Sequence, residues 1–413
     1  MRETKDSGLE WIGEIPAEWG LSKIGQVYRL RNTKVSDTDY PPLSVTNKGI
    51  VPQLDTAAKT NAHDDRKLVR KGDFAINSRS DRRGSCGISD YDGSVSLINT
   101  ILAPLGEMNP GYYDWLFHTV QFGDEFYKFG HGIVDDLWTT GWQDMKKITI
   151  PTPPLAEQRC IADFLDAKCA EFDALTADIQ IQIDTLEQYK RSVITETVTK
   201  GLNPNAEMKD SGIQWIGNMP AHWDVVRGKY ILHYMQKPVR EDDGVITCFR
   251  DGEVTLRSNR REEGFTMSDK EIGYQGIDVG DLVVHGMDGF AGSIGISDSR
   301  GKASPVLNVL DTDQCKRYIM YYLRSMAYSD VFLALATGIR VRSCDLRWNK
   351  LAELSYPVPP LDEQNAIVKH IDSVLSKADA VIADKKAQLA TLDEYKKSLI
   401  FEYVTGKKEV PVS

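Results

Sequence analysis

The sequence predicts an α+β protein made of two similar halves, each a globular domain followed by one long helix. Three observations support this fold class: motifs that occur twice, short β-rich runs bounded by glycine and aspartate, and two helical stretches of over 40 residues without proline or glycine. We expect the long helices to form an antiparallel coiled coil that separates the globular domains, with a pseudo-two-fold internal repeat.

The repeat is clearest at the start of each half. Residues 5–19 return at residues 209–223, and ten of these fifteen positions are identical at an offset of 204. A second match starts at Gly72-Asp73 and Gly280-Asp281, at an offset of 208. The chain is therefore a tandem duplication of a unit of about 205 residues, a period too long for a solenoid.

Within each half, short runs rich in β-forming residues predict strands. Residues 73–76 and 281–284 contain the aspartates of the two Gly-Asp pairs, and residues 245–249 form another such run. An amphipathic stretch in each half predicts one helix, over residues 112–129 and over residues 312–336. Short strands mixed with helices are typical of an α+β domain.

A long helix is predicted after each of two proline pairs, Pro153-Pro154 and Pro359-Pro360, which match at an offset of 206. Apolar residues recur about every seven positions and predict a coiled-coil seam. In the first helix the seam consists of Leu165, Phe172, Ile179, Leu186 and Val193, flanked by Leu175, Ile183 and Tyr189. In the second helix it consists of Ile371, Val374, Leu375, Val381, Ile382, Leu389, Leu392 and Leu399. Forty helical residues form a rod on the order of 60 Å long, whose length favours a spacer over an ordinary two-helix core.

These patterns divide the chain into four consecutive segments. We expect globular domains at residues 1–152 and 203–358, a first long helix at 153–202, and a second long helix with a C-terminal tail at 359–413. The two copies agree least over residues 29–70 and 231–278. Two copies of one scaffold that differ in their interiors are expected to recognise two different targets.

The composition is that of a globular protein of two or three domains, with 413 residues, 41% of them hydrophobic and 27% charged. No signal peptide, no apolar run of about 18 residues and no Cys-x-x-Cys pair occurs, so we expect a cytoplasmic protein with reduced thiols. The formal net charge of −10 argues against nucleic acid, but phosphate contacts need only a local basic face. Residues 300–350 supply one, with nine Lys/Arg against four Asp/Glu.

The duplicated motifs resemble those of the specificity subunits of type I restriction-modification systems. They are Ser-Gly-x-x-Trp-Ile-Gly-x-x-Pro-x-x-Trp from Ser7 and Ser211, the Gly-Asp pairs at Gly72 and Gly280, and Pro-Pro-Leu-x-Glu-Gln from Pro153 and Pro359. The resemblance covers essentially the whole chain. It implies that each globular domain is a target-recognition domain that reads one half of a bipartite site in double-stranded DNA.

The resemblance also implies the partners of this chain. The helices would set the spacing between the half-sites and dock two methyltransferase subunits, and motor-nuclease subunits would join the complex. The chain itself would be non-catalytic and would hold no cofactor. S-adenosylmethionine, ATP and Mg²⁺ would be bound by the partner subunits.

The loop after the first Gly-Asp strand faces DNA in that family, and here it is rich in arginine. Arginine binds guanine edges or phosphates and asparagine suits adenine, although a solvated turn could have the same composition. A second loop, at residues 46–49, is either a DNA-reading loop or a plain hairpin turn. The candidate DNA-binding residues of the first domain are Lys48, Asn77, Ser78, Arg79, Arg82 and Arg83.

The matching loop of the second domain contains a histidine but no arginine, and other candidates come from nearby basic clusters. Each cluster suits either a phosphate contact or an ordinary solvated surface. The candidate residues of the second domain are Arg250, Arg257, Arg260, Arg261, His285, Arg340, Arg342 and Arg347. We expect the repeated residues Trp11, Trp19, Trp215 and Trp223 to pack inside the domains, because they are identical in both copies while the targets differ.

Motifs of common enzymes are missing from the sequence. It contains no G-x-x-x-x-G-K-[ST], no Asn/Asp-Pro-Pro-aromatic motif, no H-E-x-x-H and no G-x-S-x-G. The sequence therefore favours a binding protein without a catalytic or metal site. Two alternatives remain open: a coiled-coil adaptor that joins protein partners without reading DNA sequence, and a nuclease with an unrecognised site.

Overall fold

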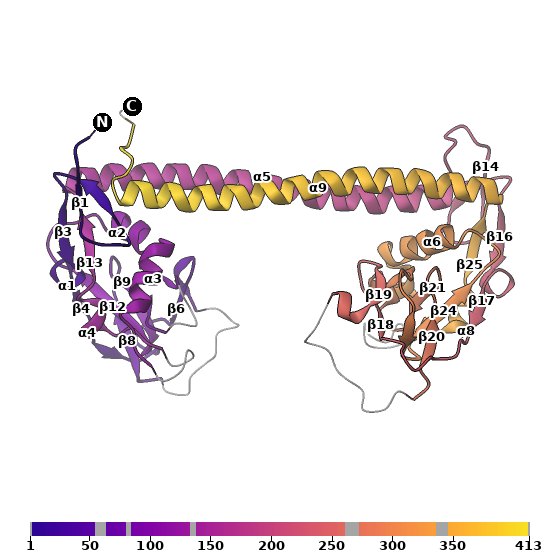
Figure 1. The fold of residues 1–413 in the computed structure, drawn as a ribbon, viewed down its shortest axis with the longest axis horizontal. Helices are drawn as coiled ribbons and strands as arrows, with labels where there is room; N and C mark the ends of the chain where they lie inside the picture. The colour runs from indigo at the N-terminus through magenta and orange to yellow at the C-terminus, as the bar shows by residue number, and fades with distance from the viewer. Residues whose placement is uncertain are drawn as a thin grey trace. The chain divides into compact units, whose positions relative to one another are not determined.

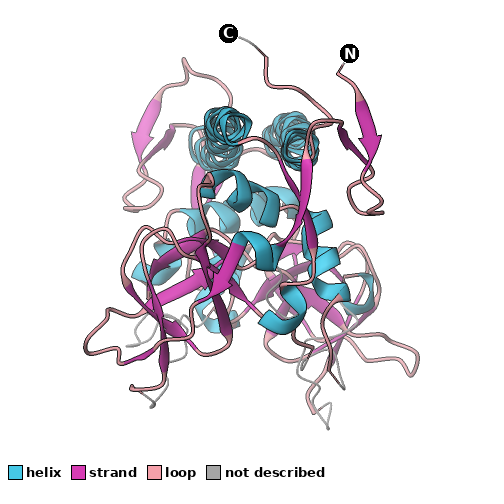
Figure 2. Cartoon of the chain, turned by 90° about the vertical axis from the view of Figure 1, so that its left-hand side faces the viewer, coloured by secondary structure: helices cyan, strands magenta, loops and turns pink. Residues whose placement is uncertain are grey.

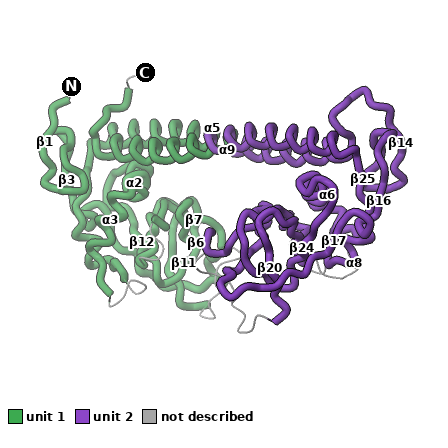
Figure 3. Tube along the Cα trace, turned by 45° about the vertical axis from the view of Figure 1, so that its right-hand side comes forward, with its two compact units in different colours: residues 1–179, 386–413 green, residues 180–385 purple. Residues whose placement is uncertain are grey.

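The computed structural model describes residues 2–53, 63–79, 84–132, 138–260, 272–335 and 346–411. Short strands and helices alternate with two long helices (Figures 1 and 2). The contacts divide the chain into unit 1, with residues 1–179 and 386–413, and unit 2, with residues 180–385 (Figure 3). Each long helix therefore contributes one part to each unit, whereas the sequence predicts four consecutive segments.

The central sheet of unit 1 has the strand order β10-β9-β12-β4, with antiparallel pairing throughout. Its strands are β4 (Tyr28–Leu30), β9 (Phe74–Asn77), β10 (Cys86–Ile88) and β12 (Asn99–Pro104). A second sheet consists of β5 (Lys34–Val35), β8 (Arg66–Val69) and β11 (Gly93–Ser96). The remaining strands pair as β1 (Thr4–Asp6) with β2 (Glu14–Pro16), β3 (Gly20–Lys23) with β13 (Thr149–Thr152), and β6 (Leu43–Thr46) with β7 (Gly49–Pro52).

The short helices of unit 1 differ in one respect from the sequence prediction. They are α1 (Ile24–Val27), α2 (Pro110–Phe117), α3 (Val120–Lys128) and α4 (Trp142–Met145). The single helix predicted over residues 112–129 is therefore two helices. Thr119 adopts an extended conformation between them, and its hydroxyl accepts a hydrogen bond from the backbone N–H of Phe122 at 3.2 Å, which starts a new helix.

Unit 2 repeats this architecture. Its central sheet has the order β17-β24-β21-β22, formed by β17 (His233–Met235), β21 (Leu282–His285), β22 (Ile294–Ile296) and β24 (Leu307–Asp311). The paired strands are β14 (Met208–Asp210) with β15 (Asn218–Pro220), β16 (Asp224–Arg227) with β25 (Ser355–Val358), β18 (Ile246–Cys248) with β19 (Val254–Leu256), and β20 (Gln275–Ile277) with β23 (Gly301–Ala303). The short helices are η3 (Gly228–Tyr230), η4 (Arg257–Asn259), η5 (Gly289–Ala291), α6 (Lys316–Tyr328), α7 (Val331–Ala334) and α8 (Trp348–Leu351).

The strand register confirms the duplication. In unit 1, Phe74 lies opposite Leu102 and Ile88. In unit 2, Leu282 lies opposite Leu310 and Ile296, so each partner is the residue 208 positions further along the chain.

The second predicted helix is also interrupted, because Asp330 adopts a left-handed conformation (φ 55°) between α6 and α7.

The two long helices are α5 (Leu155–Lys200) and α9 (Leu361–Val404), and they run antiparallel within each unit. In unit 1 the ring of Phe164 lies 4.5 Å from that of Tyr403, and Phe172 lies 5.6 Å from Tyr395, measured between centroids. In unit 2 an ion pair joins Lys190 Nζ to Asp379 Oδ1 at 2.6 Å. In unit 1, residues later in α5 therefore contact residues earlier in α9, which makes the two helices antiparallel, as the sequence predicts.

The predicted seam is correct in part. Leu165, Ile179 and Ile183 are buried, whereas Leu175 and Tyr189 are 45% and 51% exposed. An α-helix of 3.6 residues per turn drifts relative to a seven-residue repeat, so the buried stripe moves to Ile194 and Val198 near the end of α5. Val381, predicted in the seam of α9, is likewise 45% exposed.

The repeated tryptophans anchor the long helices to the globular parts. Trp19 and Trp223 are buried, as predicted, and the indole N–H of Trp19 donates to Glu157 Oε2 at 2.8 Å at the start of α5. A glycine with left-handed backbone follows each long helix: Gly201 (φ 73°) comes directly after α5, and Gly406 (φ 72°) lies two residues after the end of α9. A side chain at Gly406 would collide with Pro16, so glycine also permits close packing there.

Candidate nucleic-acid interface

The Gly-Asp motif builds the turn that begins a central strand in each unit. Gly72 and Gly280 both have a φ of 86°, a conformation that favours glycine. The carboxylate of Asp73 then accepts the backbone N–H of Arg70 at 2.9 Å, and that of Asp281 accepts the N–H of Asp278 at 2.8 Å. The motif is therefore structural, and the candidates Asn77 and His285 lie at the opposite end of β9 and β21.

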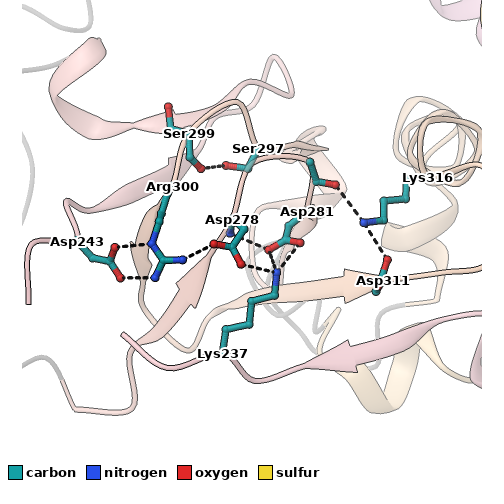
Figure 4. A network of polar contacts seen from close by, with 10 residues as sticks. Lys237, Asp243, Asp278, Asp281, Ser297, Ser299, Arg300, Asp311 and Lys316 are labelled. Atoms are coloured by element: carbon teal, nitrogen blue, oxygen red, sulfur yellow. Dashed lines mark hydrogen bonds and ion pairs between the residues drawn. The ribbon is translucent and has the colours of Figure 1, made fainter. Parts of the chain in front are cut away.

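Ion pairs hold the Gly-Asp end of the strand in place. In unit 1, Arg31 Nε contacts Asp73 Oδ2 at 2.5 Å. In unit 2, Lys237 Nζ contacts Asp281 Oδ2 at 2.6 Å and also Asp278, which contacts Arg300 (Figure 4). These charges are satisfied within the domain, so we assign them to the fold.

At the other end of β21, the structure brings three candidate residues of unit 2 together. His285 Nδ1 accepts hydrogen bonds from the backbone N–H groups of Met287 and Asp288, at 3.2 and 2.9 Å. The guanidinium of Arg250 contacts Asp288 Oδ1 at 3.2 Å. The N–H of Leu346 donates to Gly286 O at 2.8 Å, which places the neighbouring Arg347 beside the same turn.

Two further candidates border the β18–β19 hairpin. Arg260 Nη1 contacts Asp251 Oδ2 at 2.7 Å and Glu253 Oε2 at 2.9 Å, and its guanidinium lies 4.2 Å from the centroid of the Phe249 ring. Arg257 Nε donates to the hydroxyl of Thr247 at 3.3 Å. The described candidates of unit 2 therefore gather around this hairpin and the β21–β22 connection.

The electrostatics of this region suit an exchangeable anion contact. The Arg250 and Arg260 side chains are 65% and 36% exposed, and solvent-exposed ion pairs contribute only about 0–1 kcal/mol. Phosphate oxygens can therefore replace these carboxylates at little cost. Burial lowers the pKa of His285, and its Nδ1 is an acceptor, so the ring is neutral and carries its proton on Nε2.

The described candidates of unit 1 fall into two groups. Lys48, at the turn between β6 and β7, and Arg79, after β9, are exposed. Asn77 and Ser78 are buried, and their side chains serve the fold: Asn77 Oδ1 accepts the N–H of Arg79 at 3.0 Å, and the Ser78 hydroxyl lies 2.8 Å from that of Thr100. Of these four residues, Lys48 and Arg79 are therefore the ones that a partner molecule can reach.

Several predicted residues lie outside the described residues, and for them the sequence prediction stands alone. They are Arg82, Arg83, Arg261, Arg340 and Arg342.

Sequence reasoning missed a groove of about 670 Å³ in unit 2, lined in part by α5, α6 and the β18–β19 hairpin. Arg324 on α6 donates to the carbonyl of Asp251 at 2.7 Å and to the Tyr328 hydroxyl at 2.8 Å. Arg191 on α5 lies over the same tyrosine ring, 5.3 Å from its centroid. The spacing of Arg324 and Tyr328, four residues apart on one helix, is the signal that could have indicated this cluster.

Among the described residues, no helix combines the length and apolar character that a membrane span requires. The same residues contain no group of three or more His, Cys, Asp or Glu side chains placed to hold a metal ion.

Comparisons with known proteins agree with this architecture. The family model of the type I restriction modification DNA specificity domain matches residues 16–185. The type I restriction enzyme MjaVIII specificity subunit from Methanocaldococcus jannaschii is 25% identical over 341 residues, which cover 77% of this chain and 76% of that protein. The MjaX specificity subunit of the same organism is 26% identical over 280 residues, which cover 64% of this chain but only 60% of the relative's length.

The chain is therefore similar to type I restriction-modification specificity subunits. Solved structures share the fold of this chain. The crystal structure of the HsdS subunit from Thermoanaerobacter tengcongensis superimposes with a TM-score of 0.52 at 16% identity, covering 95% of this chain and 98% of that one. A chain from a study of complex assembly in the type I R-M system gives a TM-score of 0.69 at 15% identity, covering 95% and 99%.

Proposed function

We propose that this chain is the sequence-specific DNA-binding subunit of a type I restriction-modification complex and that each unit reads one half of a bipartite site. The observation that carries the proposal is the duplicated scaffold with different residues at one place. The equivalent strands β9 and β21 end at Asn77 in one unit and at His285 in the other, and the residues that follow are Ser78-Arg79 and Gly286-Met287. One frame with two different contact surfaces suits two different half-sites.

The long helices suit the roles of spacer and docking surface. α5 and α9 are uninterrupted over 46 and 44 residues. They leave apolar side chains exposed at positions that correspond at an offset of 206: Leu175 with Val381, and Tyr189 with Tyr395. Exposed apolar residues at repeated positions fit a partner that is present in two copies. We infer that two methyltransferase subunits cover them and that motor-nuclease subunits then join.

In this proposal the chain carries no catalytic site and no cofactor. S-adenosylmethionine, ATP and Mg²⁺ belong to the partner subunits, and the complex works in the cytoplasm, where its DNA is found. These assignments rest on the similarity of the chain to type I specificity subunits.

Replacing the interior of unit 1 by that of unit 2 tests the proposal. Residues 24–148 would be exchanged for residues 228–354, because β3 with β13 and β16 with β25 form equivalent junctions. We expect the variant complex to methylate a site whose two half-sites have the same sequence, that of the original unit 2. Mapping of methylated bases in cells that carry the variant measures this directly.

Two outcomes would contradict the proposal. If methylation of the original bipartite site persists, unit 1 does not read a half-site. If the purified wild-type complex binds duplex DNA without sequence preference, the chain is an adaptor that joins protein partners.

A further inference from the structure

Unit 1 contains a small apolar cavity directly behind its candidate DNA-binding turn. It has a volume of about 30 Å³, and its lining includes Ser78 and Arg79, which follow β9. Its walls are mainly aromatic and come from α2, α3 and the segment before α4; the aromatic residues are Phe117, Phe122, Phe126, Tyr127 and Trp138. A water-sized probe needs about 10–15 Å³, so the cavity has room for one or two groups of methyl size.

Hydrogen bonds hold the walls of this cavity apart. The indole N–H of Trp138 donates to the Tyr127 carbonyl at 2.9 Å, and the two rings stack with centroids 5.3 Å apart. The Thr140 hydroxyl donates to the carbonyl of Phe126 at 2.8 Å. A Cβ placed on Gly123 of α3 would meet no atom within 4 Å, so the space beside this helix is open. The cavity is thus part of a fixed framework.

Unit 2 has a leucine where unit 1 has this cavity's threonine. Thr140 and Leu346 are equivalent, because their N–H groups donate to Ser78 O and Gly286 O, at 2.9 and 2.8 Å. Both are buried, but the longer Leu346 side chain reaches the turn, and a Cβ on Gly289 would lie 2.6 Å from its Cδ1. The two copies therefore differ at the point where their targets are expected to differ.

Resting on the proposed function, we propose that this cavity accepts a methyl group carried on the major-groove edge of a base in the half-site read by unit 1. The 5-methyl group of thymine is one such group, and a methyl group on the amino nitrogen of adenine is the other. A base edge otherwise offers polar donors and acceptors, so a methyl group is the part that an aromatic cavity favours. Arg79 is exposed and belongs to the cavity lining, so it can hold the adjacent phosphate or base.

Binding of modified duplexes tests this inference. The wild-type complex with its methyltransferase subunits would be titrated with its mapped site, in which each thymine in turn is replaced by deoxyuridine, which lacks only the methyl group. Removing one buried methyl group should weaken binding about 4- to 10-fold at one position of the unit 1 half-site. In a second series of duplexes, each adenine in turn is replaced by N6-methyladenine. If one of these replacements tightens binding and no deoxyuridine replacement weakens it, the methyl group that the cavity accepts is the one on adenine.

A variant that fills the cavity, compared with a control variant on the same helix, tests whether the cavity causes the methyl effect. Gly123→Leu places an apolar side chain in the open space, and Gln121→Leu adds the same side chain on the same helix outside the cavity wall. We expect Gly123→Leu to weaken binding of the methyl-bearing site and to abolish the difference between it and the methyl-free duplex, whereas Gln121→Leu keeps that difference. Thermal unfolding checks that both variants are folded.

The inference is wrong if no thymine or methyladenine in that half-site changes the affinity, or if Gly123→Leu keeps the methyl effect. Neither result would affect the proposed function, because the complex would still prefer its own site. Loss of all sequence preference in the wild-type complex would instead remove the proposed function itself.

Discussion

At the scale of single residues, the two copies preserve an ion pair while reversing its charges. Arg70 Nη1 contacts Asp92 Oδ2 at 2.7 Å in unit 1. The equivalent residues of unit 2, 208 positions later, are Asp278 and Arg300, which also form an ion pair. The ion pair is thus retained, although the acidic and the basic residue have exchanged positions. The backbone N–H of Lys71 and the Arg70 guanidinium lower the pKa of Asp92.

This reversal predicts the behaviour of a swapped pair. Arg70→Asp and Asp92→Arg each place like charges side by side in unit 1, so each single variant should be slightly less stable than the wild type. The double variant recreates the arrangement of unit 2 and should be more stable than either single variant. Urea unfolding at low salt measures this coupling, and it is refuted if the two single effects simply add in the double variant.

A second residue-scale comparison concerns the turn after the central strand. Asn77 and His285 are equivalent, and each side chain accepts a backbone N–H two residues further along, at 3.0 and 3.2 Å. Only the histidine titrates near neutral pH. Its lowered pKa means that the folded state favours the neutral ring.

The sign of the pH effect follows from that shift. The contribution of His285 is fully present above its ordinary pKa of about 6.5 and is lost as the pH falls from there towards the folded-state pKa. We therefore expect unit 2 to lose stability between pH 7.5 and pH 5.5. His285→Asn, which copies unit 1, should keep the fold and reduce this loss. The urea midpoint of unfolding, measured at both pH values for the wild type and the variant, tests this prediction. An equal loss of stability in the variant would exclude His285 as the cause.

At the scale of elements, the continuity of the long helices leads to a prediction about site geometry. Seven residues inserted after Ile179 in α5 and after Lys385 in α9 lie at the junctions between the units and preserve the register of the seam. They lengthen each helix by about 10 Å, or about three base pairs of duplex. We expect the methylated site to gain about three base pairs in its spacer with both half-sites unchanged.

Mapping of the bases that the complex with the insertion variant methylates measures the length of the spacer. An unchanged spacer would show that the helices do not set the distance. Insertion near Lys200 and Gly201 is a poor alternative, because Gly201 ends α5 with left-handed backbone and packs against Trp223.

At the scale of the whole molecule, each unit needs segments that are far apart in the sequence. The core of unit 1 combines Ile12 and Leu165 with Leu399, Tyr403 and Val404 from the end of α9. The hydroxyl of Tyr112 also donates to the carbonyl of Val404 at 2.7 Å. The first domain of the chain is therefore completed by its last helix.

Truncation after Lys385 should accordingly destabilise unit 1 and spare unit 2. Removal of the buried Leu399, Tyr403 and Val404 side chains costs on the order of 5 kcal/mol. Hydrogen exchange read by mass spectrometry should show lost protection in β9 and β12 and retained protection in β21 and β24. Equal protection of both sheets would mean that unit 1 folds without its C-terminal segment.

The sequence alone determined the duplication, the strands that follow the Gly-Asp pairs and the two long helices. Each depends on local patterning, such as the positive φ at Gly72 and Gly280 or the seven-residue spacing of apolar positions. The tertiary structure decided what depends on neighbours distant in the chain. It showed that Asn77 and Ser78 are buried and bonded within the domain, and that Arg250 and Arg260 are already paired with carboxylates. It also exposed Leu175 and Tyr189, because burial of a helical residue depends on the helix packed against it.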